Sequence, residues 1–78
     1  MEIILPGFSK RLKQLRQEHH LTQLAMAEFL EKTPRHYQAI EAGTVNVSAT
    51  MLIFLSQYFH VSTDYLLGLS DARECGSL

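Results

Sequence analysis

Apolar residues recur along much of the chain at three- and four-residue steps, which is the spacing of one face of an α-helix. Phe8, Leu12 and Leu15 form the first stripe of this kind, with lysine, arginine and glutamine on the polar side. A longer stripe runs from Met51 to Phe59. The pattern predicts helices separated by short connections and no β-strand.

Residues that favour helix ends divide this pattern into five predicted helices. A side-chain hydroxyl can accept a hydrogen bond from a free backbone N–H at the start of a helix. The four residues expected to cap helices in this way are Thr22, Thr33, Ser48 and Ser62. The second helix is predicted over about 23–30, and Pro34 begins the third, because proline is tolerated directly after a cap. Gly43 and Gly68 are the expected stops, and His20 is a candidate non-glycine C-cap.

The predicted organisation is one domain over residues 8–69. An N-terminal arm, 1–7, would precede it and end at Pro6–Gly7. Residues 70–78 have no periodicity and are predicted to be a flexible tail. Leu24 is among the side chains of the second helix that are available to the core. The residues expected to be largely buried are Phe8, Leu12, Leu15, Met26, Leu30, Tyr37, Ile40, Leu52, Leu55, Leu66 and Leu67.

The composition is that of one small globular domain. The chain has 78 residues, of which 46% are hydrophobic and 19% charged, so it is too apolar for a disordered protein. Its single cysteine, Cys75, cannot form an internal disulfide, which argues against a disulfide-stapled secreted protein. No apolar run approaches the roughly 18 residues that cross a membrane, and Ile3–Leu5 is too short for the core of a signal peptide. We therefore expect a cytoplasmic protein.

The charge is unevenly distributed along the chain. The formal net charge is −1, which excludes a wholly basic protein that coats nucleic acid by charge alone. Six basic and three acidic residues give +3 over residues 8–40, whereas one basic and four acidic residues give −3 over residues 41–78. The near-neutral total therefore hides a dipolar chain.

The sequence offers little for catalysis or metal binding. His19 and His20 are adjacent and would point apart on a helix, and no other histidine lies three or four positions from either. Neither the ligand spacing nor the rigid shell of a metal site is evident. No nucleophile is paired with a base, and a chain this short has little room for a pocket. We predict no enzyme activity, no metal and no cofactor.

Two short helices joined by a tight turn, with a capped second helix, form a unit that suits DNA. A helix fits the major groove, where its N-terminal residues reach base edges, and its free N–H groups favour phosphate. The specific motifs include Leu21-Thr22-Gln23, Met26-Ala27, Ile40-Glu41-Ala42-Gly43 and Asp64-Tyr65-Leu66-Leu67-Gly68. Their combined spacing resembles the Cro/CI-type (XRE) helix-turn-helix family of bacterial and phage regulators over about residues 8–69.

The resemblance implies a compact five-helix, lambda-repressor-like DNA-binding domain with its helix-turn-helix motif at about residues 23–42. It implies that Gln23 contacts DNA, usually at phosphate, and that the exposed early positions of the third helix read bases. It also implies that Arg16 and Glu41 pair inside the domain. The residues predicted to bind DNA are Gln23, Lys32, Thr33, Arg35, His36, Gln38, Ala39 and Thr44.

Three departures from the family pattern bear on function. Glu31 and Lys32 stand in the turn, where the family commonly has glycine and then an apolar residue. Thr44 stands where the family often has a lysine or arginine that binds phosphate, so fewer backbone contacts are expected. Phe54 stands where a polar residue is common, which predicts an extra apolar surface.

Two hypotheses for function remain. The first is a sequence-specific regulator, a repressor that binds a palindromic operator in double-stranded DNA as a homodimer. The second is a protein-interaction module or antitoxin-like partner with the same fold and weak DNA binding. No membrane and no small-molecule ligand is expected as a partner. The candidate dimer contacts, which could instead complete the core of one monomer, are Met51, Phe54, Tyr65 and Leu69, or Ile3–Leu5.

Overall fold

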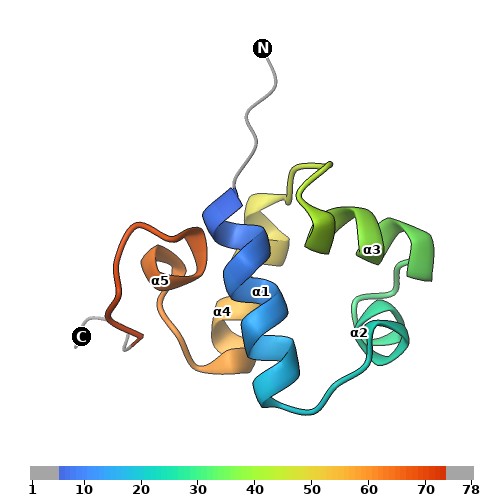
Figure 1. Cartoon of the computed structure of the whole chain (residues 1–78), viewed down its shortest axis with the longest axis horizontal. Coiled ribbons are helices and arrows are strands. Elements are labelled where there is room, and N and C mark those ends of the chain that lie inside the picture. The colour runs from blue at the N-terminus through green and yellow to red at the C-terminus, as the bar shows by residue number, and fades with distance from the viewer. Residues whose placement is uncertain (1–5, 74–78) are drawn as a thin grey trace.

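The computed structural model describes residues 6–73, which form five α-helices and contain no strand. The helices are α1 (Pro6–Glu18), α2 (Gln23–Phe29), α3 (Pro34–Ala42), α4 (Ala49–Phe59) and α5 (Thr63–Leu67). Figure 1 shows α1 in the middle of the domain, with α5 on one side and α2 and α3 on the other. Helix α1 packs against α3 and α5, α2 packs against α3, and α4 packs against α5. The predicted all-α, five-helix fold is confirmed.

The four predicted N-caps are confirmed. In each, the side-chain oxygen accepts a hydrogen bond from the backbone N–H three residues further on. The distances are 3.0 Å at Thr22, 3.1 Å at Thr33, 3.1 Å at Ser48 and 2.9 Å at Ser62. Gly43 and Gly68 are the C-caps of α3 and α5, each with a φ of 81°. Helix α2 ends at Phe29, with Leu30 as its C-cap.

The core is built mainly from the predicted apolar stripes. The buried hydrophobic side chains are Phe8, Leu12, Leu15, Met26, Ala27, Tyr37, Ile40, Leu55, Phe59, Val61, Tyr65 and Leu66. Leu30, Leu52 and Leu67, which were expected to be largely buried, are only partly buried and pack against the edge of this core. The prediction for these three leucines is therefore corrected.

Leu24 does not belong to the core, because 55% of the residue is exposed. Met26 and Ala27 are the buried residues of α2, and Leu30 packs against the core just beyond it. At about 100° per residue, their shared direction lies roughly a third of a turn away from Leu24. A helix of seven residues has room for one inward face only, and Leu24 lies beside it.

The domain includes residues at both ends that the sequence analysis placed outside it. Helix α1 begins at Pro6 and not at Phe8, so Pro6–Gly7 are helical and do not belong to an N-terminal arm. A Cβ at Gly7 would come within 2.9 Å of the Leu67 carbonyl oxygen, so the close approach of α1 to the end of α5 requires glycine. Residues 1–5, which include Ile3–Leu5, lie outside the described residues.

Residues 70–73 were predicted to be part of a flexible tail, but they are bound to the domain. The backbone N–H of Ser62 donates to the Arg73 carbonyl oxygen at 2.7 Å, and the Ser62 hydroxyl donates to the Ala72 carbonyl oxygen at 3.1 Å. The Arg73 guanidinium also donates to both carboxylate oxygens of Glu18, at 2.7 and 2.8 Å. Residues 74–78, including Cys75, lie outside the described residues. No helix within residues 6–73 has the length and apolar character needed to cross a membrane.

Candidate nucleic-acid interface

Helices α2 and α3 form a helix-turn-helix over residues 23–42, the range predicted from the sequence. The turn between them contains Glu31 in the left-handed conformation, with a φ of 57°. The Glu31 N–H donates to the Glu28 carbonyl oxygen at 3.1 Å, and the Lys32 N–H donates to the Ala27 carbonyl oxygen at 2.8 Å. These are the two bonds of a Schellman C-cap, whose left-handed position is usually a glycine. Glu31 therefore occupies a left-handed position that favours glycine, at a cost of about 1–2 kcal/mol in backbone strain.

The exposed side of α3 carries most of the residues predicted to read bases. Tyr37, Ile40 and Glu41 are buried. At about 100° per residue, the direction opposite these three is that of Arg35 and Ala39. Arg35, His36 and Gln38 are exposed and Ala39 is partly exposed. Arg35 and Ala39 thus occupy the centre of the outer face, and the same helical geometry puts His36 and Gln38 at its two edges.

The remaining predicted contacts lie at the two ends of α3. Lys32 and Thr33 precede its first residue and are exposed, with the Thr33 hydroxyl serving as the cap. Thr44 follows its last turn and donates a hydrogen bond to the Ala39 carbonyl oxygen at 3.1 Å. Gln23 is partly buried, and its Nε2 donates to Oε1 of Glu41 at 3.3 Å. The amide of Gln23 is therefore already tied to α3.

The ion pair of Arg16 and Glu41 joins α1 to the end of α3. Arg16 Nε donates to Oε2 of Glu41 at 2.8 Å, and a terminal nitrogen donates to Oε1 at 3.0 Å. The other terminal nitrogen donates to the Leu21 carbonyl oxygen at 2.7 Å, so the same guanidinium also holds the loop before α2. Burial acts to raise the pKa of Glu41, but its interactions with Arg16, Tyr37 and Gln23 outweigh burial and hold that pKa below its usual value.

Tyr37 lies on the buried side of α3, near this pair. Burial is the main reason that the pKa of Tyr37 is raised, and the Glu41 carboxylate adds to it. Its hydroxyl oxygen is buried and has no hydrogen-bond partner of good geometry within residues 6–73. A buried hydroxyl without a partner costs about 1–3 kcal/mol, and the attraction of the Tyr37 hydroxyl to the Glu41 carboxylate offsets part of that cost.

The basic excess of residues 8–40 lies on α1 and not on the motif itself. Within residues 23–42, two basic residues, Lys32 and Arg35, are outnumbered by three acidic ones, so the motif has a formal charge of −1. On α1, Arg11 and Arg16 are held in ion pairs. Lys32 and Arg35 are exposed and form no ion pair within the described part of the chain. They are the two cations that the motif can offer to phosphate or base.

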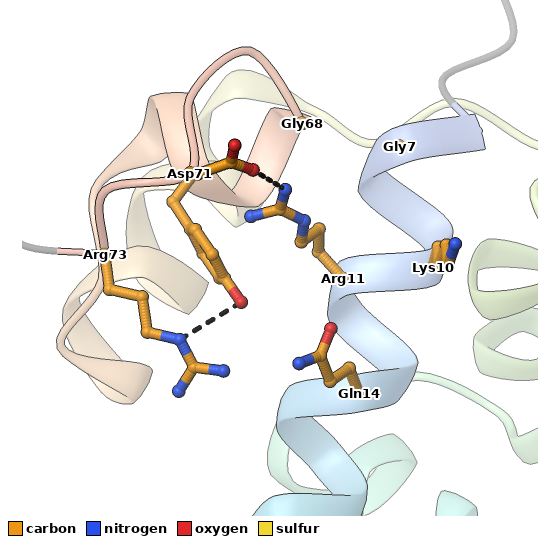
Figure 2. A pocket seen from close by; sticks show the side chains of 8 residues that line it. Gly7, Lys10, Arg11, Gln14, Gly68, Asp71 and Arg73 are labelled. Atoms are coloured by element: carbon orange, nitrogen blue, oxygen red, sulfur yellow. Dashed lines mark hydrogen bonds and ion pairs between the residues drawn. The ribbon is translucent and has the colours of Figure 1, made fainter.

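A polar cleft of about 490 Å³ lies between α1 and the end of α5, away from the motif (Figure 2). Its side chains are largely engaged with one another. Arg11 donates to Asp71 at 2.9 Å, and Arg73 Nε donates to the Tyr65 hydroxyl at 3.1 Å. The Arg11 and Arg73 guanidinium carbons lie 4.0 and 5.0 Å from the centroid of the Tyr65 ring. The side chains that line the cleft therefore hold residues 70–73 against the domain.

Tyr65 was predicted either to contact a second copy or to complete the core of one monomer, and it lies in the core. Tyr65 is only 5% exposed, because α1 and the segment of residues 70–73 cover it. The sequence carries no signal for these contacts, since Arg11 and Asp71 are 60 positions apart and Arg73 and Glu18 are 55 apart.

The two adjacent histidines have structural roles. The His19 ring packs against Phe59 with 4.9 Å between ring centroids, and its Nδ1 lies 3.0 Å from the Leu15 carbonyl oxygen. His20 follows α1 in the left-handed conformation, with a φ of 56°. Within residues 6–73, no three histidine, cysteine or acidic side chains are grouped so that they could hold a metal ion.

Known proteins match most of the chain. The profile of a helix-turn-helix family matches residues 12–66. The chain is 36% identical over 64 residues to the uncharacterized HTH-type transcriptional regulator YobD of Bacillus subtilis, a match that covers 82% of this chain and 57% of that protein. It is 42% identical over 60 residues to the uncharacterized HTH-type transcriptional regulator YqaE of the same organism, covering 77% of this chain and 52% of that protein. No solved structure gives a significant match.

A further relative is the HTH-type transcriptional regulator PrpR of Mycobacterium tuberculosis, at 35% identity over 63 residues, which are 81% of this chain and 13% of that protein. The chain thus spans about half the length of the two Bacillus relatives and a small part of PrpR. The five-helix fold, the α2–turn–α3 unit and the family match together show that the chain belongs to the XRE-type helix-turn-helix family.

Proposed function

We propose that this chain is a DNA-binding transcriptional regulator that places α3 in the major groove of double-stranded DNA. The observation that carries the proposal is the outer face of α3, where Arg35 and Ala39 are central and no buried side chain intervenes. An arginine near the start of a helix can donate to O6 and N7 of one guanine, and an alanine methyl can contact a thymine methyl. His36 and Gln38 would contact neighbouring bases from the edges of the same face.

The residues at the two ends of α3 would hold the DNA backbone. Lys32 and Thr33 lie beside the start of the helix, and Gln23 and Thr44 lie toward its end. A phosphate oxygen can accept a hydrogen bond from each of these side chains. Since the motif itself carries only two cations, its own electrostatic attraction to phosphate is small. We further infer a repressor that binds a palindromic operator as a dimer, in the cytoplasm and without enzyme activity.

The proposal is tested by selecting binding sites from a random pool of duplex DNA and then measuring three variants on the selected site. Arg35→Ala should weaken binding and relax the preference at one base position by about 1–3 kcal/mol. Lys32→Ala should weaken binding on all sequences and reduce the slope of log K against log salt by about one unit. Lys13→Ala removes the same charge from an exposed position on α1, outside the motif, and serves as the matched control.

Two outcomes would contradict this function. One is that the pool yields no preferred sequence, and the other is that Arg35→Ala changes neither affinity nor base preference. The second candidate function, a protein-interaction module of the same fold, is favoured by the motif charge of −1 and by the exposure of Val45 and Phe54. It would be preferred if binding to every sequence stayed in the non-specific range of about 10⁻⁴–10⁻⁶ M at physiological salt.

A further inference from the structure

Three aromatic side chains form a contiguous exposed cluster on α2 and α4, which we call the aromatic surface. It consists of Phe29, Phe54 and Tyr58, which are 41%, 41% and 37% exposed. The Phe29 ring lies 5.2 Å from that of Phe54 and 4.3 Å from that of Tyr58, measured between centroids. Single exposed apolar residues are ordinary, but contiguous apolar patches mark sites of association, and aromatic residues are enriched in interfaces.

A groove of about 310 Å³ adjoins the aromatic surface. Phe29 and Phe54 belong both to the ring cluster and to the wall of this groove. Leu30 and Met51 supply further apolar wall. Exposed rings and a hollow therefore lie side by side on one face, so this face has both a protruding and a receiving part. Such a surface can be complementary to itself, which is what a two-fold contact between identical chains requires.

The charges of α4 also favour a second copy of this chain as the occupant. A two-fold axis brings a surface against itself, so any charge close to the axis would face a like charge. Helix α4 has the sequence ATMLIFLSQYF and contains no charged residue in 11 positions, although 19% of the chain is charged. Among the residues that line the groove, only Glu31 is charged.

The available area fits a weak, concentration-dependent dimer. A large aromatic side chain offers about 200 Å², so the three exposed fractions leave on the order of 240 Å² of ring surface on each copy. The rings of two copies thus provide about half of the roughly 1,000 Å² that a specific contact needs. The groove walls and the polar rim must supply the rest.

We propose that two copies of this chain associate through the aromatic surface, with Phe54 of each copy packed into the groove of the other. The proposal names the dimer contact that the proposed operator binding requires, and in that sense it rests on the proposed function. The contact itself can nevertheless be measured without DNA.

The test is sedimentation equilibrium of the full chain over a wide concentration range, from a few micromolar to about a millimolar. We expect the weight-average mass of the unmodified chain to rise from the monomer value of 8.9 kDa toward twice that value. Phe54→Glu should weaken association at least tenfold, because it sets two carboxylates against each other. Leu69→Glu makes the same kind of change at a residue that is 75% exposed and outside the aromatic surface, and it should leave association unchanged.

A second variant separates a broken contact from a damaged fold. Phe54→Lys alone should also weaken association, but an equimolar mixture of Phe54→Glu and Phe54→Lys chains should associate more strongly than either variant alone, because opposite charges then meet. Helical circular dichroism must show each variant folded.

Three outcomes would overturn the proposal. The unmodified chain could remain at 8.9 kDa throughout, Phe54→Glu could associate as strongly as the unmodified chain, or Leu69→Glu could abolish association. An unmodified chain that stays monomeric but still binds the selected DNA site through Arg35 would overturn this proposal alone. A dimer without sequence preference would overturn the proposed function alone.

Discussion

The ion pair of Arg16 and Glu41 allows a sharp test of how α3 is held in place. The Glu41 side chain is 3% exposed and that of Arg16 is 12% exposed, so water cannot replace a missing partner. Breaking a buried pair by removing one member costs about 3–5 kcal/mol. A domain of 78 residues has a total free energy of unfolding on the order of 4–12 kcal/mol. Arg16→Met should therefore remove a large part of the stability at pH 7.

The pH dependence should reveal the cause of that loss. The pKa of Glu41 lies below its usual value of 4.5, so the pair stabilises the native chain fully above that pH and less as the pH falls through the lower native pKa. In Arg16→Met, Glu41 keeps its hydrogen bond from Gln23 but loses its cationic partner, so burial raises its pKa. The variant then gains stability from Glu41 as the pH falls. The difference in unfolding free energy between the two chains should shrink steadily from pH 7 toward pH 4.

Urea unfolding followed by circular dichroism at pH 7, 6, 5 and 4 measures the unfolding free energy of both chains. The other carboxylates contribute equally to the two values, so they cancel in the difference. Lys13→Met is the control, because Lys13 is an exposed cation on the same helix that forms no ion pair within residues 6–73, and its loss should cost less than about 1 kcal/mol. Replacing both members, as in Arg16→Met with Glu41→Leu, should recover much of the loss. If Arg16→Met lowered the free energy of unfolding by less than about 1 kcal/mol at pH 7, or by an amount that does not vary with pH, the reasoning would be refuted.

Three further predictions concern the turn, the core and the C-terminal segment. Glu31→Gly should raise the free energy of unfolding, measured with urea, by about 1 kcal/mol, because it relieves the left-handed strain. Glu31→Ala keeps the Cβ and should give no such gain. Tyr37→Phe removes a buried hydroxyl that lacks a partner, so stability should stay level or rise by up to about 1 kcal/mol; a clear loss would mean that the hydroxyl bonds to Glu41. Hydrogen bonds from Arg73 lower the pKa of Glu18 to about 2, so its contribution should be lost as the pH falls from about 4.5 toward 2. Thermal melts of Glu18→Gln should then show a shallower loss of stability over this range, and an unchanged acid profile would contradict the assignment.

The parts of the fold that follow from local chemistry were predicted well from the sequence. Each N-cap hydroxyl bonds to a backbone N–H only three residues away, and a left-handed glycine ends a helix through bonds to its own last turn. Signals of this kind lie within a few neighbouring residues. The bounds of α3 followed from Thr33, Pro34 and Gly43 alone.

What the sequence did not predict depends on contacts between distant parts of the chain. The burial of Tyr65 results from Arg11 and from residues 70–73, and no local pattern links these segments. The exposure of Leu24 depends on which face of a seven-residue helix meets the rest of the domain. Phe54 was predicted to form an apolar surface, but Phe29 and Tyr58 were not, because the three rings meet only once α2 and α4 pack together.

Glu41 links the stability of the domain to its proposed contact with DNA. Its carboxylate accepts hydrogen bonds from Arg16 on α1 and from Gln23 on α2, so one buried group on α3 fixes both neighbouring helices. The Gln23 amide has two N–H donors, and Glu41 engages its nitrogen. One N–H is then left for a phosphate, whereas the amide oxygen cannot bond to phosphate because both are acceptors. The direction in which Gln23 can meet the DNA backbone is therefore set by the same carboxylate that holds α3 against α1.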